Sequence, residues 1–249
     1  MNEKLYTVPL NESFEADHEC PFCALEREAE QRTLRFCLGP SASYMEPDVR
    51  GETNRLGFCT HHSKKVFEYG NALGSALILQ SYYEQLLEDL QKDMGDTPVP
   101  EKRSLFSKTK AAPDPLWKKI DRKVSSCFLC DRVDYHMERY YHTFFMMIKE
   151  PEFRLKVENS KGFCLHHFAR LLQTAQEKLP NSQREWFRST IYPLMQTNLE
   201  RVKGDLDWFV AKYDYRNANA DWKNSRDALP RTIQKLQGGF PADPPFSER

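Results

Sequence analysis

The chain has 249 residues, enough for one large domain or two small ones. Its 36 basic and 36 acidic residues balance, so charge gives no reason to expect binding to nucleic acid or to an anionic membrane. No apolar run approaches the roughly 20 residues that span a bilayer, and Met1–Leu10 lacks the regions of a signal peptide. We expect a cytoplasmic protein, in which the seven cysteines stay reduced and favour metal or redox chemistry over disulfides.

The first unit, residues 1–95, is predicted to be helical. It contains a Cys-x2-Cys pair, and Ala24–Leu38 consists largely of residues that favour helices. Apolar residues recur at helical spacing between Leu73 and Leu90. Residues 96–115 hold several prolines and lysines and are predicted to form an exposed linker.

The second unit, residues 116–238, is also predicted to be helical. Apolar residues from Leu165 to Leu179 keep a helical spacing. Trp186–Tyr213 is a long helical candidate, in which Pro193 is expected to produce a kink or a break. Residues 239–249 are rich in proline and are expected to be irregular. No segment alternates as a strand would, so the predicted fold is mainly α.

The two units contain the same motifs in the same order. The offset between counterparts stays between 104 and 107 residues. Such a repeat predicts two similar helical units, each organised around a metal site. The matched motifs are Cys20-Pro-Phe-Cys23 with Cys127-Phe-Leu-Cys130, Glu46-Pro-Asp-Val-Arg50 with Glu150-Pro-Glu-Phe-Arg154, Asn54 with Asn159, and Gly57-Phe-Cys59-Thr-His-His62 with Gly162-Phe-Cys164-Leu-His-His167.

Each unit offers three cysteines and one histidine at the spacing of a metal site. Two cysteines three residues apart can chelate one ion from a tight turn, and a Cys-x2-His pair completes the tetrahedron that structural zinc prefers. A glycine two residues before the third cysteine permits the positive φ that such a turn often needs. The predicted ligand sets, for two zinc ions per chain, are Cys20, Cys23, Cys59 and His62 in the first unit, and Cys127, Cys130, Cys164 and His167 in the second.

Two adjacent histidines are present in each unit, and helical geometry selects between them. If the third cysteine opens a helix, the residue three positions later returns to its face, whereas the residue two positions later does not. This selects His62 and His167 over His61 and His166. Cys37 has no counterpart in the repeat and is interpreted as a small buried apolar residue.

Other cysteine chemistry competes with zinc. A thioredoxin-type motif needs a preceding strand and a βαβ setting, and neither is evident. A c-type haem site needs a histidine directly after the Cys-x2-Cys pair, where Ala24 and Asp131 stand instead. An iron–sulfur cluster stays open as the alternative cofactor, because thiolates with one histidine can hold one and ligand identity does not separate it from zinc.

A longer pattern includes the repeated motifs and continues with Asp214-Tyr-Arg-Asn217, Trp222, Asp227-Ala-Leu-Pro-Arg231 and Gly238. With it, the chain resembles the DUF6062 family of uncharacterised bacterial proteins from about Cys20 to Gly238. The resemblance covers nearly the whole chain and implies no established activity.

The number of ligands favours a structural function. Four protein ligands leave no open position for a catalytic water, and three thiolates with one neutral imidazole make a zinc site a poor Lewis acid. We expect a non-enzymatic binding or adaptor protein with an unknown protein or small-molecule partner, and we assign no catalytic residue. The alternatives are an iron–sulfur or thiol-based redox protein, and a hydrolase or transferase whose cleft is lined by the repeated Glu, Arg and Asn residues.

Overall fold

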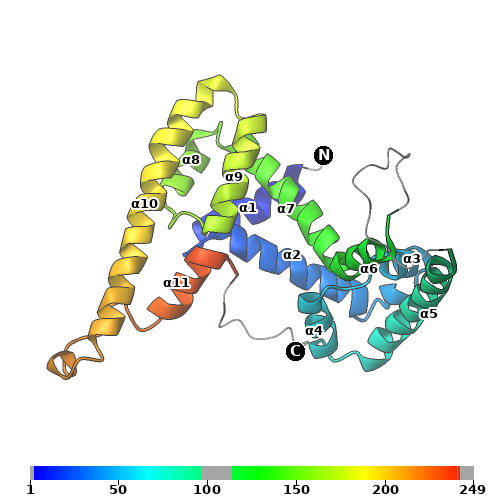
Figure 1. Ribbon diagram of the computed structural model, residues 1–249. Coiled ribbons are helices and arrows are strands. Elements are labelled where there is room, and N and C mark those ends of the chain that lie inside the picture. The colour runs from blue at the N-terminus through cyan, green and yellow to red at the C-terminus, as the bar shows by residue number, and fades with distance from the viewer. Residues whose placement is uncertain (1–2, 97–113, 240, 242–249) are drawn as a thin grey trace, which may run out of the picture. The chain divides into compact units, whose positions relative to one another are not determined.

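The computed structural model describes residues 3–96, 114–239 and 241, and within them the chain forms helices and no strands (Figure 1). The prediction of a mainly α fold is confirmed. Most of the predicted linker and tail, residues 96–115 and 239–249, lies outside the described residues. The elements are α1 (Glu3–Glu15), α2 (Pro21–Leu38), η1 (Ser43–Met45), α3 (Pro47–Leu56), α4 (Thr60–Glu68), α5 (Ala72–Asp96), α6 (Leu116–Ser125), α7 (Phe128–Met147), α8 (Pro151–Asn159), α9 (Leu165–Lys178), α10 (Asn181–Ala211), η2 (Tyr215–Asn217) and α11 (Ala228–Gln237).

Contacts divide the chain into two compact units that interleave along the sequence. Among the described residues, unit 1 comprises 3–29, 134–239 and 241, and unit 2 comprises 30–96 and 114–133. The boundaries fall inside α2 and α7, so each of these helices begins in one unit and ends in the other. These contact units, called unit 1 and unit 2 from here on, therefore differ from the predicted first and second units, which divide the chain at the linker.

Counterpart motifs lie in counterpart elements. The order α2, α3, α4, α5 recurs as α7, α8, α9, α10. Glu46 and Glu150 stand at the N-caps of α3 and α8, each directly before a proline in the first turn. The Nε atoms of Arg50 and Arg154 donate to the carbonyl six residues earlier, at 3.0 Å and 2.6 Å. Both arginines thus brace the connection that leads into their helix.

The core of unit 1 is aromatic. Phe14, Phe22, Phe144 and Phe163 are each at most 5% exposed, and the centroids of every pair of these rings lie 5.8–6.2 Å apart. Such pairs contribute about 0.5–1.5 kcal/mol each beyond the burial of their surface. The Phe22 ring also lies 5.9 Å from the His167 ring, so the aromatic core extends to one of the predicted ligands.

The core of unit 2 is mainly aliphatic. Cys37 belongs to it with no exposed surface, which confirms the interpretation of this residue as a buried apolar side chain. Burial raises the pKa of the Cys37 thiol to about 11, so the reactive thiolate is scarce at neutral pH. The aliphatic members from α2, α3, α4 and α5 are Leu34, Leu38, Val49, Leu56, Val66 and Ile78.

The longest described helix, α10, has 31 residues and runs through Pro193. The sequence predicts a kink or a break at this proline; the helix does not break there, and a kink stays a prediction. A proline removes one backbone hydrogen bond from a helix, a loss that need not end a helix of this length. Neither α10 nor any other helix in the described ranges combines the length and the apolarity needed to cross a membrane.

Candidate metal centres

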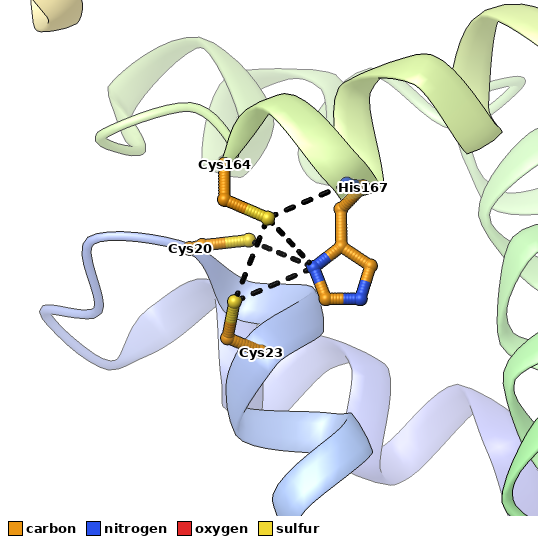
Figure 2. Close-up of side chains that lie close together, drawn as sticks. All are labelled: Cys20, Cys23, Cys164 and His167. Atoms are coloured by element: carbon orange, nitrogen blue, oxygen red, sulfur yellow. Dashed lines mark hydrogen bonds between the residues drawn. The ribbon is translucent and has the colours of Figure 1, made fainter. Parts of the chain in front are cut away.

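Unit 1 brings together Cys20, Cys23, Cys164 and His167 (Figure 2). Cys20 directly precedes α2 and Cys23 lies in its first turn, while Cys164 is the N-cap of α9. The Nδ1 atom of His167 lies 3.5, 3.4 and 3.1 Å from the Sγ atoms of Cys20, Cys23 and Cys164, in that order. The Sγ atoms of Cys23 and Cys164 are 3.7 Å apart. All four side chains are buried.

Unit 2 brings together Cys59, His62, Cys127 and Cys130. The Nδ1 atom of His62 lies 3.4, 3.3 and 3.2 Å from the Sγ atoms of Cys59, Cys127 and Cys130, in that order. The Sγ atoms of Cys59 and Cys130 are 3.8 Å apart. Cys127 and His62 are buried, whereas Cys59 and Cys130 are partly exposed.

Both arrangements fit a single four-coordinate ion. With Zn–S bonds of about 2.3 Å and a Zn–N bond of about 2.0–2.1 Å, tetrahedral angles place sulfur and nitrogen about 3.6 Å apart and two sulfurs about 3.8 Å apart. The sulfur–nitrogen distances are 3.1–3.5 Å and the measured sulfur–sulfur distances are 3.7 and 3.8 Å. Within each group the four donor atoms all lie within 4.8 Å of one another.

The glycines before the third cysteines have the backbone conformation that was expected of them. Gly57 has φ +61° and Gly162 has φ +72°, values that side chains other than glycine seldom adopt. At Gly57 a Cβ atom would also lie 2.8 Å from the ring of Tyr82. The turn that leads to each Cys-x2-His pair therefore depends on a glycine in both units.

Helix geometry decides which histidine approaches the sulfurs. Cys59 and Cys164 have extended backbones and cap α4 and α9, so the histidine three residues later lies at the third helical position. His62 and His167 accordingly turn Nδ1 toward the cysteines, while His61 is largely exposed. The rings lie where the helix-face argument placed them, and metal binding by them stays a prediction.

The predicted grouping of the eight ligands is wrong. We expected each Cys-x2-Cys pair to meet the next Cys-x2-His pair along the chain. Instead, Cys20 and Cys23 meet Cys164 and His167, while Cys127 and Cys130 meet Cys59 and His62. Each candidate centre therefore combines the Cys-x2-Cys pair of one predicted unit with the Cys-x2-His pair of the other.

Long helices separate the motifs along the chain. The 18 residues of α2, which start at the Cys20–Cys23 turn, extend about 27 Å at 1.5 Å per residue. α2 begins in unit 1 and ends in unit 2, where Cys59 and His62 follow it. α7, with 20 residues, begins in unit 2 and ends in unit 1, where Cys164 and His167 follow it. Each Cys-x2-Cys pair and the next Cys-x2-His pair along the chain therefore belong to different units.

Carboxylates contact the far side of both histidines. Glu30 Oε1 lies 3.0 Å from His62 Nε2 and 3.2 Å from His61 Nε2, and its other oxygen pairs with Lys65. In unit 1, Glu26 Oε2 is 3.5 Å from His167 Nε2, too far for a good hydrogen bond, and this buried nitrogen has no hydrogen-bond partner among the described residues. A carboxylate on the second ring nitrogen fixes the orientation of a metal-binding histidine.

The charges of unit 2 favour a cation between the sulfurs. Burial opposes the charged form of His62, but hydrogen bonds with Cys127 and Glu30 outweigh it and raise the His62 pKa to about 10. Burial also disfavours the Cys127 thiolate and the Glu30 carboxylate, yet the contact with His62 helps to lower their pKa values to about 6 and about 2. Since metal ligands must be deprotonated, a divalent ion bound here would displace a proton from His62 Nδ1.

Unit 1 shows the same tendency. Burial disfavours the charged form of His167, but hydrogen bonds with Cys164 and Cys20 raise the His167 pKa to about 10. Hydrogen bonds from Cys20 and Cys23 lower the pKa of Cys164 well below its ordinary value. Thiolate and imidazolium are therefore held together in both centres, and a divalent ion can replace the proton between them.

The motifs did not point to Glu26, Glu30 or Lys235, which support the candidate centres. The two glutamates lie in α2, one helical turn apart, and nothing in a run of helix-forming residues marks them. Lys235 in α11 is almost fully buried, which the alternation of polar and apolar residues in that helix does not reveal. Partners of this kind are recognised only once the ligands are placed in space.

Comparison with known proteins identifies a family without an activity. The model of a family of unknown function, DUF6062, matches residues 1–243. The comparison with curated proteins and the comparison with solved structures each gave no match. A function for the chain therefore has to be argued from its own candidate centres.

Proposed function

The chain belongs to the DUF6062 family, whose function is unknown, and we propose that it is a zinc-stabilised binding or adaptor protein without enzymatic activity. One observation carries the proposal: three Sγ atoms and one Nδ1 atom converge at tetrahedral spacing in two separate places. Each place joins segments more than 60 residues apart in sequence, as in the contact of Cys127 with His62. An ion there ties distant parts of one unit together.

Zinc is the metal that this donor set favours. Three thiolates with one imidazole in tetrahedral geometry are typical of structural zinc. An iron–sulfur cluster distributes its four ligands over several iron atoms, so the ligands stand further apart than around a single ion. Donor atoms within 4.8 Å of one another therefore support a mononuclear centre over a cluster.

A structural function follows from the filled coordination sphere. Four protein ligands leave no position for substrate or water, and the zinc centre carries a charge of about −1, which weakens it as a Lewis acid. The repeated Arg50 and Arg154 hold backbone carbonyls at helix starts, which supports a bracing function for them over a catalytic cleft.

We assign the proposed binding function to an exposed apolar surface on α5, in a unit that its metal centre would stabilise. The side chains of Leu73, Tyr83, Leu87 and Met94 on α5 are each more than half exposed. Exposed apolar side chains on one helix suit contact with another protein. We therefore place a protein partner before a small-molecule partner.

Elemental analysis of protein purified anaerobically, without chelator, tests the zinc proposal. We expect about two zinc ions per chain and a colourless solution. Visible absorption that bleaches on reduction would instead establish an iron–sulfur protein. A folded chain that contains no metal and takes up no zinc on titration would contradict the proposal altogether.

A further inference from the structure

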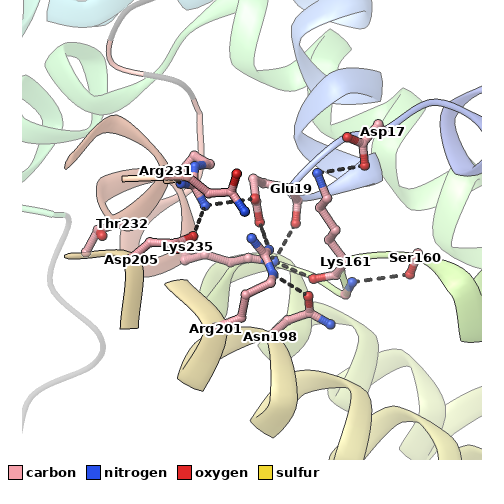
Figure 3. Close-up of polar contacts among 12 residues, drawn as sticks. Asp17, Glu19, Ser160, Lys161, Asn198, Arg201, Asp205, Arg231, Thr232 and Lys235 are labelled. Carbon is pink, nitrogen blue, oxygen red and sulfur yellow. Dashed lines mark hydrogen bonds and ion pairs between the residues drawn. The ribbon is translucent and has the colours of Figure 1, made fainter. Parts of the chain in front are cut away.

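The C-terminal helix α11 fastens the two turns that supply the ligands of unit 1. The Nζ atom of Lys235 donates to the backbone oxygens of Glu19 and Lys161, at 2.5 Å each (Figure 3). Glu19 directly precedes Cys20, and Lys161 lies three residues before Cys164. With 1% of its surface exposed, Lys235 makes these bonds away from water, where loss of either partner is costly. One side chain therefore holds both halves of the ligand set.

Charges around this lysine are paired rather than left isolated. The Glu19 carboxylate lies 3.4 Å from Lys235 Nζ and 2.5 Å from an Arg201 guanidinium nitrogen. Arg231 of α11, in turn, pairs with Asp205 of α10 at 2.8 Å. Removal of one charged side chain from such a buried group leaves the charges of the other side chains uncompensated. This group anchors α11 beside the ligand turns.

The end of α11 lies directly against the sulfurs. Gly238 has φ +81°, and a Cβ atom placed on it would lie 3.5 Å from Cys164 Sγ and 3.9 Å from Cys23 Sγ. Gly238 thus packs beside both of these sulfurs. None of the four ligands of unit 1 is more than 4% exposed.

The centre of unit 2 is more open. Two of its three sulfur ligands, Cys59 and Cys130, belong to partly exposed residues, and Cys130 stands in the first turn of α7. Exchange of a ligand on zinc requires the incoming donor to reach the metal or a departing sulfur. The partial exposure of Cys59 and Cys130 favours such access at unit 2, and the burial of all four ligands disfavours it at unit 1.

We propose that the two centres differ in exchange: the unit 2 centre gives up and takes back its metal by reaction with small thiols or chelators, whereas α11 locks the metal of unit 1 in place. The proposal rests on the zinc occupancy proposed above. In the exchange step the electron pair of an incoming thiolate or chelator nitrogen would form a bond to zinc, and the bond from zinc to the sulfur of Cys59 or Cys130 would break. The remaining two Zn–S bonds and the Zn–N bond would be replaced in the same way, so that zinc leaves with the incoming donors. Each freed thiolate would take the proton that an incoming thiol gives up, or a proton from water. No oxidant or reductant is needed.

Zinc release from the full-length, two-zinc chain to an excess of a chromophoric pyridylazo chelator measures the difference. We expect two phases of equal amplitude whose rates differ by at least about tenfold, the range typical of altered metal surroundings. The fast phase disappears in Cys59→Ser, and the slow phase disappears in Cys23→Ser. A single phase, or the opposite assignment, would overturn the proposal.

A matched pair of glycines tests whether α11 slows metal release from unit 1. Gly238 and Gly239 both have positive φ, +81° and +61°, but an added Cβ at Gly239 meets nothing within 4 Å. We expect Gly238→Val to accelerate the slow phase about tenfold and to leave the fast phase unchanged, because its Cβ already reaches van der Waals contact with both sulfurs and the two further methyl groups of valine would overpack the space beside them. Gly239→Val, which imposes similar backbone strain, should leave both phases unchanged. Equal effects of the two variants would refute the claim that α11 slows metal release from unit 1.

Lys235→Met provides a second variant in case Gly238→Val does not fold. We expect it to accelerate only the slow phase, and circular dichroism verifies that the helices remain. An unchanged slow phase in this variant would also refute the lock. Different results would contradict the proposed function and the proposed difference in metal exchange. A chain without zinc contradicts the proposed function, whereas a chain that releases both zinc ions together contradicts only the difference in exchange.

Discussion

The two candidate centres have the same ligands but different surroundings. In unit 1 the ligands are fully buried, border an aromatic core through Phe22, and are fastened by Lys235. In unit 2 the core is mainly aliphatic, two of the cysteines are partly exposed residues, and Glu30 contacts the histidine through a 3.0 Å hydrogen bond. The unit 1 centre thus depends on the burial of its ligands, and the unit 2 centre depends on a carboxylate that orients its histidine. A repeated motif can keep its ligand geometry while the support for that geometry changes.

Cysteine replacement should give the largest effect and the sharpest contrast. Cys164→Ser removes a ligand from the enclosed centre, and we expect loss of one zinc and of about 3–5 kcal/mol, roughly 10 °C in melting temperature. Cys59→Ser should also lose one zinc but lower the melting temperature by about half as much, because its site is already partly solvated. Calorimetry with metal analysis measures both.

Cys37→Ser is the matched control, because Cys37 is buried in unit 2 but belongs to neither candidate ligand set. It should keep both zinc ions and lose about 1–3 kcal/mol from burial of a hydroxyl group. If Cys59→Ser and Cys164→Ser matched this control in metal content and melting temperature, the assigned ligands would be wrong.

Histidine replacement separates ligands from neighbours within each centre. His62→Ala and His167→Ala should each release one zinc, because they remove the Nδ1 atom that faces the sulfurs. His61→Ala and His166→Ala should retain both ions. Metal content after gel filtration measures the contrast, and loss of zinc in His61→Ala or His166→Ala would show that the helix-face argument chose the wrong ring.

Carboxylate replacement should give the smallest effect and should differ between the units. Glu30→Gln weakens a hydrogen bond to His62 and the pairing with Lys65, so we expect zinc affinity at unit 2 to fall about tenfold. Glu26→Gln should change affinity at unit 1 less than about threefold, because Glu26 stands 3.5 Å from His167 Nε2 and is not hydrogen-bonded to it. Competition titration with a zinc chelator compares them. Equal losses would mean that both centres depend on their carboxylates alike.

The local features of this chain were predictable from its sequence. Helical spacing and composition indicated the mainly α fold, and the Gly57 and Gly162 positions indicated positive φ because the glycine precedes a ligand turn. The choice of His62 and His167 followed from helical periodicity alone. Each of these features depends on residues a few positions apart, where backbone geometry limits the possibilities.

Long-range features were not predictable in the same way. Adjacency in the sequence suggested that Cys23 would meet Cys59, but Cys23 lies in unit 1 beside Cys164, whereas Cys59 lies in unit 2. The helix α10 does not break at Pro193, although proline disfavours the interior of a helix. Burial of Lys235 depends on segments more than 70 residues away. Motif spacing identifies candidate ligands, but the packing of segments distant in sequence decides which of them meet.

Metal content of two double variants tests the crossed ligand sets most directly. Cys20→Ser with Cys164→Ser removes two ligands from one centre, so the account predicts that about one zinc per chain remains. Cys20→Ser with Cys59→Ser removes one ligand from each centre, so the account predicts that both ions are lost. The reverse result, with one zinc retained in the second variant and none in the first, would contradict the crossed arrangement and restore a centre within each repeat.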